Sequence, residues 1–308
     1  MATYTALEAL DLPTVARRYG LHAPTAGPLK GGAANSSFRL DTPDDGRAYV
    51  LTALDNHDEA SARHLARITR AFADLGLPTA RVVADRDGDD ITVLDGKPYL
   101  LKELIPGEVA DPLPEELLPA AGELLAQLHG FPPAGIGLPV GTRRLSPAHR
   151  AAAADFPDRG FAAWLDRQLT KIDRHEADHR RPSVAVHGDL FADNLIVRPD
   201  GGLSVIDWET ASLDDPLLDL GMAAVGLCQT PIGFLSPTRL TLLLDGYTPR
   251  RPLPPEDRAQ LPIEITHAAV IIAFHRYHRH NVRFPNPARA SYHEQMITFV
   301  ESVGDAHP

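Results

Sequence analysis

The residues best suited to chemistry lie in one short segment near the middle of the chain. Residues 187–194 read His-Gly-Asp-Leu-Phe-Ala-Asp-Asn, and residues 205–209 read Val-Ile-Asp-Trp-Glu. Asp189 and Asn194 are separated by five positions, and Asp207 follows on the same stretch. Transfer of a phosphoryl group from ATP requires a carboxylate near the attacking hydroxyl and oxygen ligands for magnesium. These residue types and their spacing therefore predict a phosphoryl-transfer site.

Short apolar runs flank these residues and are expected to position them. Residues 183–186 and 195–197 are predicted as short strands, and residues 203–206 as the return strand of a hairpin. The sequence Pro-Asp-Gly-Gly at residues 199–202 is typical of the turn between the last two. Asp189 and Asn194 then lie on a loop, and Asp207 at a strand end. Loops held by a rigid scaffold are where polar side chains can be aimed at a ligand.

The same spacing of Asp, Asn and a second Asp on the next hairpin occurs in protein kinases. The segments H-G-D-L-F-A-D-N, V-I-D-W-E and D-D-P-L-L-D-L-G resemble the aminoglycoside phosphotransferase and choline kinase superfamily. Leu-Phe after Asp189 is similar to the homoserine kinase (type II) branch. These motifs cover residues 183–221, and the rest of the chain matches by layout alone. The resemblance implies an α+β fold of the protein-kinase type with two lobes. An antiparallel sheet with one main helix forms the first lobe, and the second is mainly helical.

The resemblance also implies a role for each residue of the motifs. Asp189 would be the catalytic carboxylate, and Asn194 and Asp207 would bind magnesium. His187 would be structural and pack the loop, whereas Asp219 would bond to its backbone and hold it. The activity implied is ATP-dependent phosphorylation of the hydroxyl of a small molecule. The expected lobes are residues 1–104, which bind the nucleotide, and residues 105–308, which carry catalysis and the substrate.

Length and charge restrict the remaining possibilities. A chain of 308 residues is long enough for two lobes with sizeable cores. Its formal net charge of −11 argues against nucleic acid and anionic membranes as partners. The single cysteine, Cys228, excludes a disulfide within the chain. No basic and apolar leader begins the sequence, and no apolar run approaches membrane-spanning length. A cytoplasmic location is therefore expected, and the oligomeric state stays open.

Two stretches of the first lobe are expected to contact the nucleotide. Residues 27–40 are predicted as strand, small-residue loop and strand, and in the resembled superfamily this hairpin lies over the ATP phosphates. Its expected contacts are Gly31, Gly32, Asn35 and Ser36. In the resembled fold, residues 105–108 are the hinge, and backbone groups near Glu103 and Ile105 would bond to adenine.

The predicted third strand, residues 48–54, departs from the kinase pattern. Protein kinases place a phosphate-binding Lys on this strand, whereas the matching position here is Thr52. Lys30 and Arg47 are candidates for the missing cation, but each is more simply explained as a solvated charge on an edge strand. Further strands are predicted at residues 81–83, 91–94 and 99–104. Helices are predicted at residues 5–19, interrupted at Pro13, and at residues 58–76, 115–129 and 161–180.

A basic stripe on the last long helical stretch, residues 263–283, permits three interpretations. Arg276, Arg279 and Arg283 can be solvated charges near a helix C-terminus. They can also bind a substrate carboxylate, which Arg holds through two hydrogen bonds. A metal site is the third possibility. It would use the histidines of this region, which are His267, His275, His278 and His293.

Three functions follow from these observations. The first is an ATP- and magnesium-dependent kinase for homoserine or a related carboxylated amino alcohol. The second is an aminoglycoside kinase or a choline or ethanolamine kinase, whose cationic substrate needs a pocket rich in carboxylates. Residues that can supply such a pocket are Asp166, Asp173, Glu176 and Asp178. The third, a non-catalytic nucleotide-binding protein, has no support from the motifs, because Asp189, Asn194 and Asp207 are all present.

Overall fold

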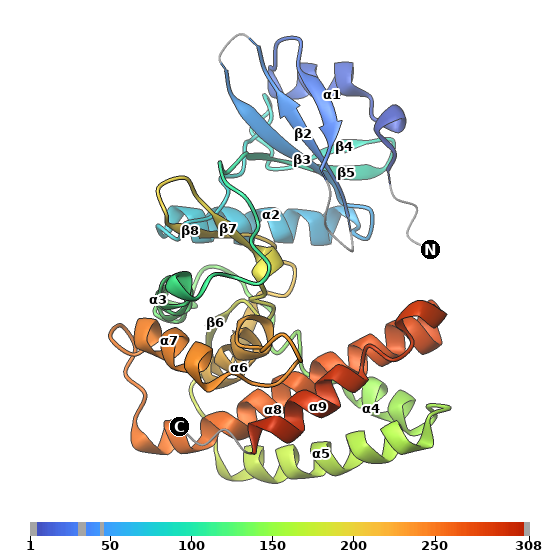
Figure 1. Ribbon diagram of the computed structural model, residues 1–308. Coiled ribbons are helices and arrows are strands. Elements are labelled where there is room, and N and C mark those ends of the chain that lie inside the picture. The colour runs from blue at the N-terminus through green and yellow to red at the C-terminus, as the bar shows by residue number, and fades with distance from the viewer. Residues whose placement is uncertain (1–4, 30–34, 44–45, 305–308) are drawn as a thin grey trace. The chain divides into compact units, whose positions relative to one another are not determined.

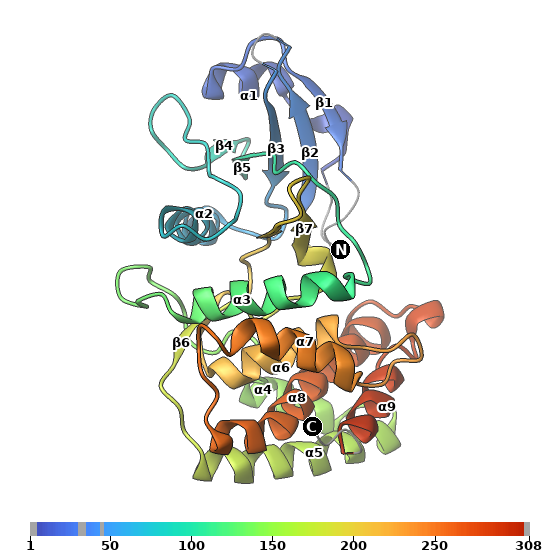
Figure 2. The ribbon, with the colours of Figure 1, turned by 60° about the vertical axis from the view of Figure 1, so that its left-hand side comes forward.

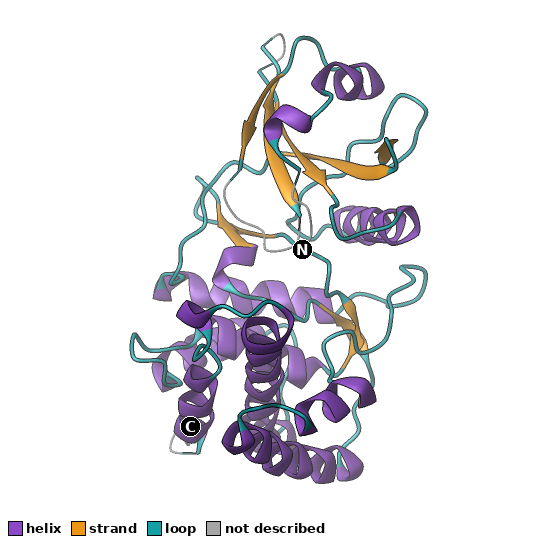
Figure 3. Cartoon of the chain, turned by 90° about the vertical axis from the view of Figure 1, so that its right-hand side faces the viewer, coloured by secondary structure: helices purple, strands orange, loops and turns teal. Residues whose placement is uncertain are grey.

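A computed structural model of the chain describes residues 5–29, 35–43 and 46–304. The chain divides into two compact units. The first unit comprises residues 1–108 together with residues 196–209, and the second comprises residues 109–195 and 210–308. The predicted α+β class is confirmed: an antiparallel sheet dominates the first unit and helices dominate the second (Figure 3).

The first unit is built on a five-stranded antiparallel sheet with the strand order β1-β2-β3-β5-β4 (Figure 1). The strands are β1 (Thr25–Pro28), β2 (Ser36–Asp41), β3 (Ala48–Ala53), β4 (Thr92–Leu94) and β5 (Lys97–Glu103). Along the central pair, Val50 lies opposite Lys102 and Thr52 opposite Leu100. Successive side chains of a strand point to opposite faces, so these four residues share one face of the sheet.

The other face of the sheet forms a hydrophobic core. Leu51 and Leu101 of the central strands pack there with Val15 and Tyr19 of helix α1 (Leu12–Tyr19). The predicted N-terminal helix is in two pieces, a 3₁₀ turn at Leu7–Ala9 and α1. α1 begins at an Asp11 cap, and its C-cap Gly20 has a left-handed backbone with φ 69°.

The long helix of the first unit is α2 (Glu59–Asp74), which contacts β5. The Asp58 carboxylate caps it by accepting from the Ser61 N–H at 2.8 Å. The prediction of a strand at residues 81–83 is wrong in part. Only Val82 forms a β-bridge, to Lys102, because the segment pairs with β5 at a single point.

A hairpin from the middle of the chain belongs to the first unit. It comprises β7 (Leu195–Val197) and β8 (Leu203–Val205), which pair with each other. The Val205 N–H donates to the Pro78 carbonyl at 2.8 Å, and the buried Trp208 ring lies 4.4 Å from the Phe72 ring of α2. The hairpin is therefore fixed on the same unit as the sheet.

Helices make up most of the second unit (Figures 2 and 3). They are α3 (Leu118–His129), α4 (Pro147–Ala154), α5 (Arg159–Asp178), α6 (Pro216–Leu227), α7 (Pro237–Tyr247), α8 (Pro255–Tyr277) and α9 (Glu294–Val303). α3 packs against α7, and α8 packs against α5, α6 and α9. Helix α6 is buried on nearly all sides. In the described ranges, none of the helices combines the length and the apolar character needed to cross a membrane.

A two-stranded sheet lies at the start of the loop that carries the sequence motif, residues 187–194. β6 (Val184–Val186) pairs in antiparallel fashion with β9 (Ser212–Asp214), a strand that the sequence did not predict. Helices α4 and α9 were also not predicted. Loop residues 187–194 leave β6, and a 3₁₀ turn at Ala192–Asn194 closes the loop before β7.

Candidate active site

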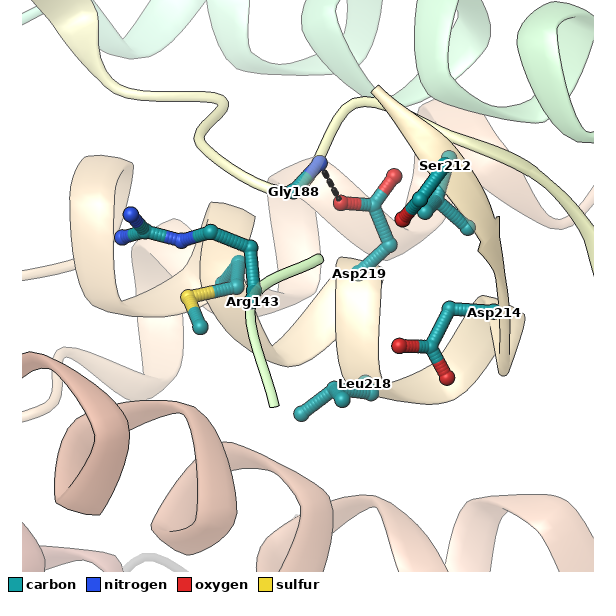
Figure 4. Close-up of a pocket in the computed structure, with 8 residues that line it drawn as sticks. Arg143, Gly188, Ser212, Asp214, Leu218 and Asp219 are labelled. Carbon is teal, nitrogen blue, oxygen red and sulfur yellow. Dashed lines mark hydrogen bonds between the residues drawn. The ribbon is translucent and has the colours of Figure 1, made fainter. Parts of the chain in front are cut away.

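The loop after β6 is held by one carboxylate. Asp219, in the first turn of α6, accepts hydrogen bonds from the backbone N–H groups of His187 at 2.9 Å and Gly188 at 2.7 Å. The second of these bonds is drawn in Figure 4. The Asp219 carboxylate also accepts from His129 Nε2 at 3.0 Å. Since both of its oxygens are engaged, the carboxylate fixes the path of the loop at its start.

The charge of Asp219 is maintained although the residue is buried. Burial works to raise the pKa of its carboxyl group, but the hydrogen bond from His129 and the nearby His187 outweigh it and lower the pKa. His129 in turn bonds through Nδ1 to the hydroxyl of Tyr247 at 2.8 Å. The loop therefore rests on a fully bonded polar network, which is what makes a buried charge tolerable.

Asp189 projects from this loop and is about one-third exposed, with 35% of its side chain accessible. Its Oδ1 accepts a hydrogen bond from Arg143 Nη2 at 3.0 Å. Its backbone carbonyl accepts from Asn194 Nδ2 at 2.8 Å. That bond uses the nitrogen of the Asn194 amide, so the amide oxygen is the atom left to act as a ligand. Asp189 and Asn194 are thus brought together and oriented by the loop itself.

Arg143 lies at the edge of a small pocket in the second unit (Figure 4). Val186, Gly188, Ser212 and Asp219 line the same pocket. Arg143 Nε and Ser212 Oγ are buried and make no hydrogen bond within the described part of the chain. The positive charge of Arg143 also acts on His275: burial chiefly, and Arg143 next, lower the pKa of His275 to about 4. A cation with spare donors therefore stands directly beside Asp189.

Asp207 lies in the first unit, two residues after β8, and is exposed. Its backbone is left-handed, with φ 67°, a conformation that Asp adopts more readily than most residues. Trp208 Nε1 donates to Thr79 Oγ1 at 3.0 Å. The residue after Asp207 is thus anchored, and Asp207 Oδ1 itself accepts from the Glu209 N–H at 3.4 Å.

A lysine accompanies Asp207 in the first unit. Lys102, on β5, is partly buried, and its charge is felt by the carboxylates of Asp207 and Glu209. Burial lowers the pKa of Lys102, and the two carboxylates oppose that effect. Within the ranges that the structure describes, the Lys102 ammonium forms neither a hydrogen bond nor an ion pair. It is thus an ammonium group beside two acidic residues but bonded to neither.

The predicted phosphate-binding hairpin is described in part. Gly31 and Gly32 lie outside the described residues, as does Lys30. Asn35 Nδ2 donates a hydrogen bond to Glu209 Oε1. Ser36 donates through its N–H and its hydroxyl to Asp55 Oδ2, at 3.0 and 2.7 Å. Asn35 is therefore bonded to the segment that carries Asp207, whereas Ser36 is bonded to Asp55, two residues after the end of β3.

The two residues predicted to contact adenine lie at the end of β5. Glu103 is the last residue of this strand, and its N–H donates to the Arg81 carbonyl at 2.9 Å. Ile105 lies two residues further along the chain. Their contacts with adenine stay a prediction.

The three arginines of the basic stripe have surroundings of their own. Arg276 donates through Nη1 to Gln295 Oε1 at 3.1 Å, and Arg283 stacks on Phe284. Arg279 is exposed in the π-helical segment His278–Arg283. Among the residues that the structure describes, no hydrogen bond or ion pair joins these arginines to Asp189, and their role in binding substrate stays a prediction.

The predicted magnesium ligands belong to different units, Asn194 to the second and Asp207 to the first, and their joint binding of magnesium stays a prediction. The amide oxygen of Asn194 and the carboxylate of Asp207 are hard oxygen ligands, and magnesium in kinases takes only one or two protein ligands beside phosphates and water. Across the described ranges, no group of three or more His, Cys, Asp or Glu side chains is arranged to hold a metal. This finding gives no support to the histidine metal site that the sequence left open.

Arg143 and Lys102 were not identified from the sequence. Arg143 lies in a loop whose path the sequence does not determine. Lys102 stands in the run Tyr-Leu-Leu-Lys-Glu at residues 99–103, where a charge within an apolar strand was the available signal.

Comparison with known proteins places this geometry in a family. The model of the phosphotransferase enzyme family matches residues 25–253. A homoserine kinase of Caulobacter vibrioides is 33% identical over 285 residues, which are 88% of this chain and 87% of that protein. A homoserine kinase of Methylobacillus flagellatus is 31% identical over 240 residues, covering 76% of this chain and 73% of its own length.

Solved structures show the same fold. A microcompartment-associated aminopropanol kinase superposes with a TM-score of 0.75 at 20% identity, covering 96% of this chain and 98% of its own. A spectinomycin phosphotransferase in complex with ADP and spectinomycin superposes with a TM-score of 0.68 at 17% identity, covering 99% and 98%. The chain therefore belongs to the phosphotransferase enzyme family and is a small-molecule kinase that transfers phosphate to an alcohol group.

Proposed function

We propose that the protein catalyses the ATP- and magnesium-dependent phosphorylation of homoserine or a related carboxylated amino alcohol. The observation that carries this proposal is the position of Arg143, whose guanidinium contacts the Asp189 carboxylate. A cation at this place suits an acceptor with a carboxylate near its hydroxyl, because arginine binds carboxylates through two parallel hydrogen bonds. The similarity to homoserine kinases over most of the chain supports the same acceptor.

In the proposed reaction the acceptor oxygen attacks the γ-phosphorus of ATP, the bond from that phosphorus to the β-phosphate oxygen breaks, and ADP leaves. Asp189 accepts the proton of the attacking hydroxyl. Magnesium, when bound, neutralises the charge on the phosphate oxygens, and Asn194 and Asp207 are its proposed ligands. Asp219 does not touch the reactants in this scheme; it holds the loop on which Asp189 stands.

An acceptor that carries several positive charges has less support. Two of the carboxylates that would have to bind it are already paired with arginines. Asp173 accepts from Arg150 at 2.8 Å, and Glu176 accepts from Arg144. Arg143 would also repel an ammonium group near Asp189. An aminoglycoside, choline or ethanolamine therefore remains the alternative acceptor, to be decided by experiment.

The test is an ADP-release assay with homoserine, choline, ethanolamine and an aminoglycoside as separate acceptors. We expect phosphorylated product with homoserine or another carboxylated alcohol. Efficient phosphorylation of the aminoglycoside, without product from any carboxylated alcohol, would overturn the proposal and favour the alternative. ADP release without a phosphorylated acceptor in any reaction would count against both.

Arginine variants then locate the group that binds the acceptor carboxylate. Loss of a hydrogen-bonded charge costs about 1.5–3 kcal/mol, so Arg143→Ala should raise the acceptor KM by about 10- to 100-fold. The KM for ATP should stay near its wild-type value. Arg276→Ala, Arg279→Ala and Arg283→Ala test the C-terminal stripe in the same way. Arg150→Ala, at an exposed ion pair with Asp173, is the matched control.

A further inference from the structure

The first unit lacks a lysine where kinases normally place one to bind nucleotide phosphates. On β3 that position is Thr52, whose hydroxyl lies 3.4 Å from the Ser37 hydroxyl. Transfer of a γ-phosphoryl group still has to neutralise the charge of the triphosphate. Another cation on the same face of the sheet would meet this requirement.

Lys102 is on that face and on the neighbouring strand. Thr52 lies opposite Leu100, and Lys102 is two residues further along β5, which makes Lys102 and Thr52 a diagonal pair. Diagonal neighbours across antiparallel strands are about 7–8 Å apart, within reach of a long side chain. The ammonium of Lys102 can therefore occupy the space that a lysine at position 52 would serve.

One backbone segment ties Lys102 to the acidic motif. Val82 forms a β-bridge with Lys102, and Thr79, three positions earlier, forms one with Val205, two residues before Asp207. The Glu103 N–H donates to the Arg81 carbonyl at 2.9 Å, which reinforces the pairing with β5. Lys102 and Asp207 are thus attached to adjacent points of the same segment. Their proximity follows from backbone pairing and does not depend on one side-chain rotamer.

Several other cations of the first unit are already paired with carboxylates. They include Arg18 with Asp87, Arg39 with Asp41, Arg63 with Glu59 and Asp89, Arg70 with Asp90, Lys97 with Asp55, and Arg198 with Asp200. Arg39 shares the face of Lys102, but it is exposed and held by Asp41. Lys102 by contrast makes no hydrogen bond or ion pair with any described residue. Its donors are available for a ligand.

We infer that Lys102 binds the phosphates of the nucleotide in place of the lysine that β3 lacks. This inference rests on the proposed function insofar as it takes the nucleotide to be ATP, and it does not depend on the acceptor. A purely structural role, in which Lys102 only balances Asp207 and Glu209, is the competing explanation. The two explanations predict different results when Lys102 is replaced. If Lys102 binds phosphates, the loss of affinity depends on the number of phosphates in the ligand; if its role is structural, it does not.

The test measures binding of adenosine, AMP, ADP and ATP, with magnesium and without any acceptor, to the full chain. Lys102→Met should weaken ADP and ATP binding by about 10- to 100-fold, the loss expected for a charged hydrogen bond. Adenosine binding should be unchanged. Lys102→Arg should keep part of the affinity for ATP, and Lys171→Met, at an exposed lysine of α5, is the control for charge alone.

A second variant separates phosphate binding from folding. Adding Thr52→Lys to the Lys102→Met chain moves the ammonium to the neighbouring strand, and it should restore part of the preference for ATP over adenosine. If Lys102→Met lost adenosine and ATP affinity equally, or lost neither, the inference would be overturned. Since no acceptor is present, a wrong assignment of homoserine as the substrate leaves this result untouched, and the two failures can be told apart.

Discussion

At the scale of single residues, the proposal depends on Asp189 acting as a base. Help from a positioned base contributes about 10² to 10⁴ in rate, so Asp189→Asn should lower kcat by a factor in that range. The amide has nearly the shape of the carboxylate, and the loop is held by Asp219 through backbone groups, so the fold and ATP binding should persist. Steady-state kinetics and nucleotide titration together check this. Turnover close to wild type would remove Asp189 from the mechanism.

A second prediction about a single residue concerns Asp207. As a proposed magnesium ligand it should affect the dependence on metal rather than proton transfer. Asp207→Ala should raise the magnesium concentration needed for half-maximal activity, or abolish transfer. Asp200→Ala, in the exposed turn between β7 and β8, removes the same charge from the same hairpin and is the control. A wild-type magnesium titration in Asp207→Ala would show that the ligand lies elsewhere.

At the scale of elements, the polar network around Asp219 needs its helices in close contact. Helices α3 and α7 lie against each other (Figure 2). Gly122 of α3 and Gly246 of α7 permit this contact, because a Cβ atom on Gly246 would collide with the Pro119 carbonyl oxygen. Overpacking costs about 1–3 kcal/mol or more when backbone must move. Gly246→Ala should therefore lower the urea midpoint. Gly160→Ala in the first turn of α5, where the nearest atom is the end of a side chain, should leave it unchanged or raise it.

The elements also show what could be predicted from the sequence. Long periodic segments such as α2 and α3 were predicted close to their actual positions. β9 was missed, because its three residues have no pattern of their own and are defined only by pairing with β6. α4 was missed although Ser146 and Pro147 mark its start. Short elements depend on tertiary partners, which the local sequence does not reveal.

Some residues of the candidate site could be predicted from the sequence and others could not. The motif spacing was enough to identify Asp189, Asn194 and Asp207 as candidates, and the hydrogen bonds of Asp219 to the loop have the geometry that the resemblance implies. Arg143 and Lys102 could not be found from spacing, because each belongs to a part of the chain that is distant in sequence from the motif. Arg143 reaches Asp189 across 46 positions. The position of Lys102 becomes visible only through the register of β3 and β5.

At the scale of the whole molecule, the chain enters the first unit twice. Residues 196–209 leave the second unit, pair with the first and return, so Asn194 and Asp207 belong to different units although few residues separate them. A single boundary near residue 104 cannot describe this arrangement. The prediction that the first unit binds the nucleotide therefore has to be tested with probes that belong to one unit each.

The two tryptophans of the chain provide such probes, because Trp208 lies in the first unit and Trp164, on α5, in the second. In the Trp164→Phe chain, ADP with magnesium should change the emission of Trp208, which stands between Asp207 and Glu209. In the Trp208→Phe chain the emission of Trp164 should stay constant. Thermal melts verify that both variants are folded, and magnesium alone is the control. A response from Trp164 alone would assign the nucleotide to the second unit, and with it the proposed role of Lys102 would fall.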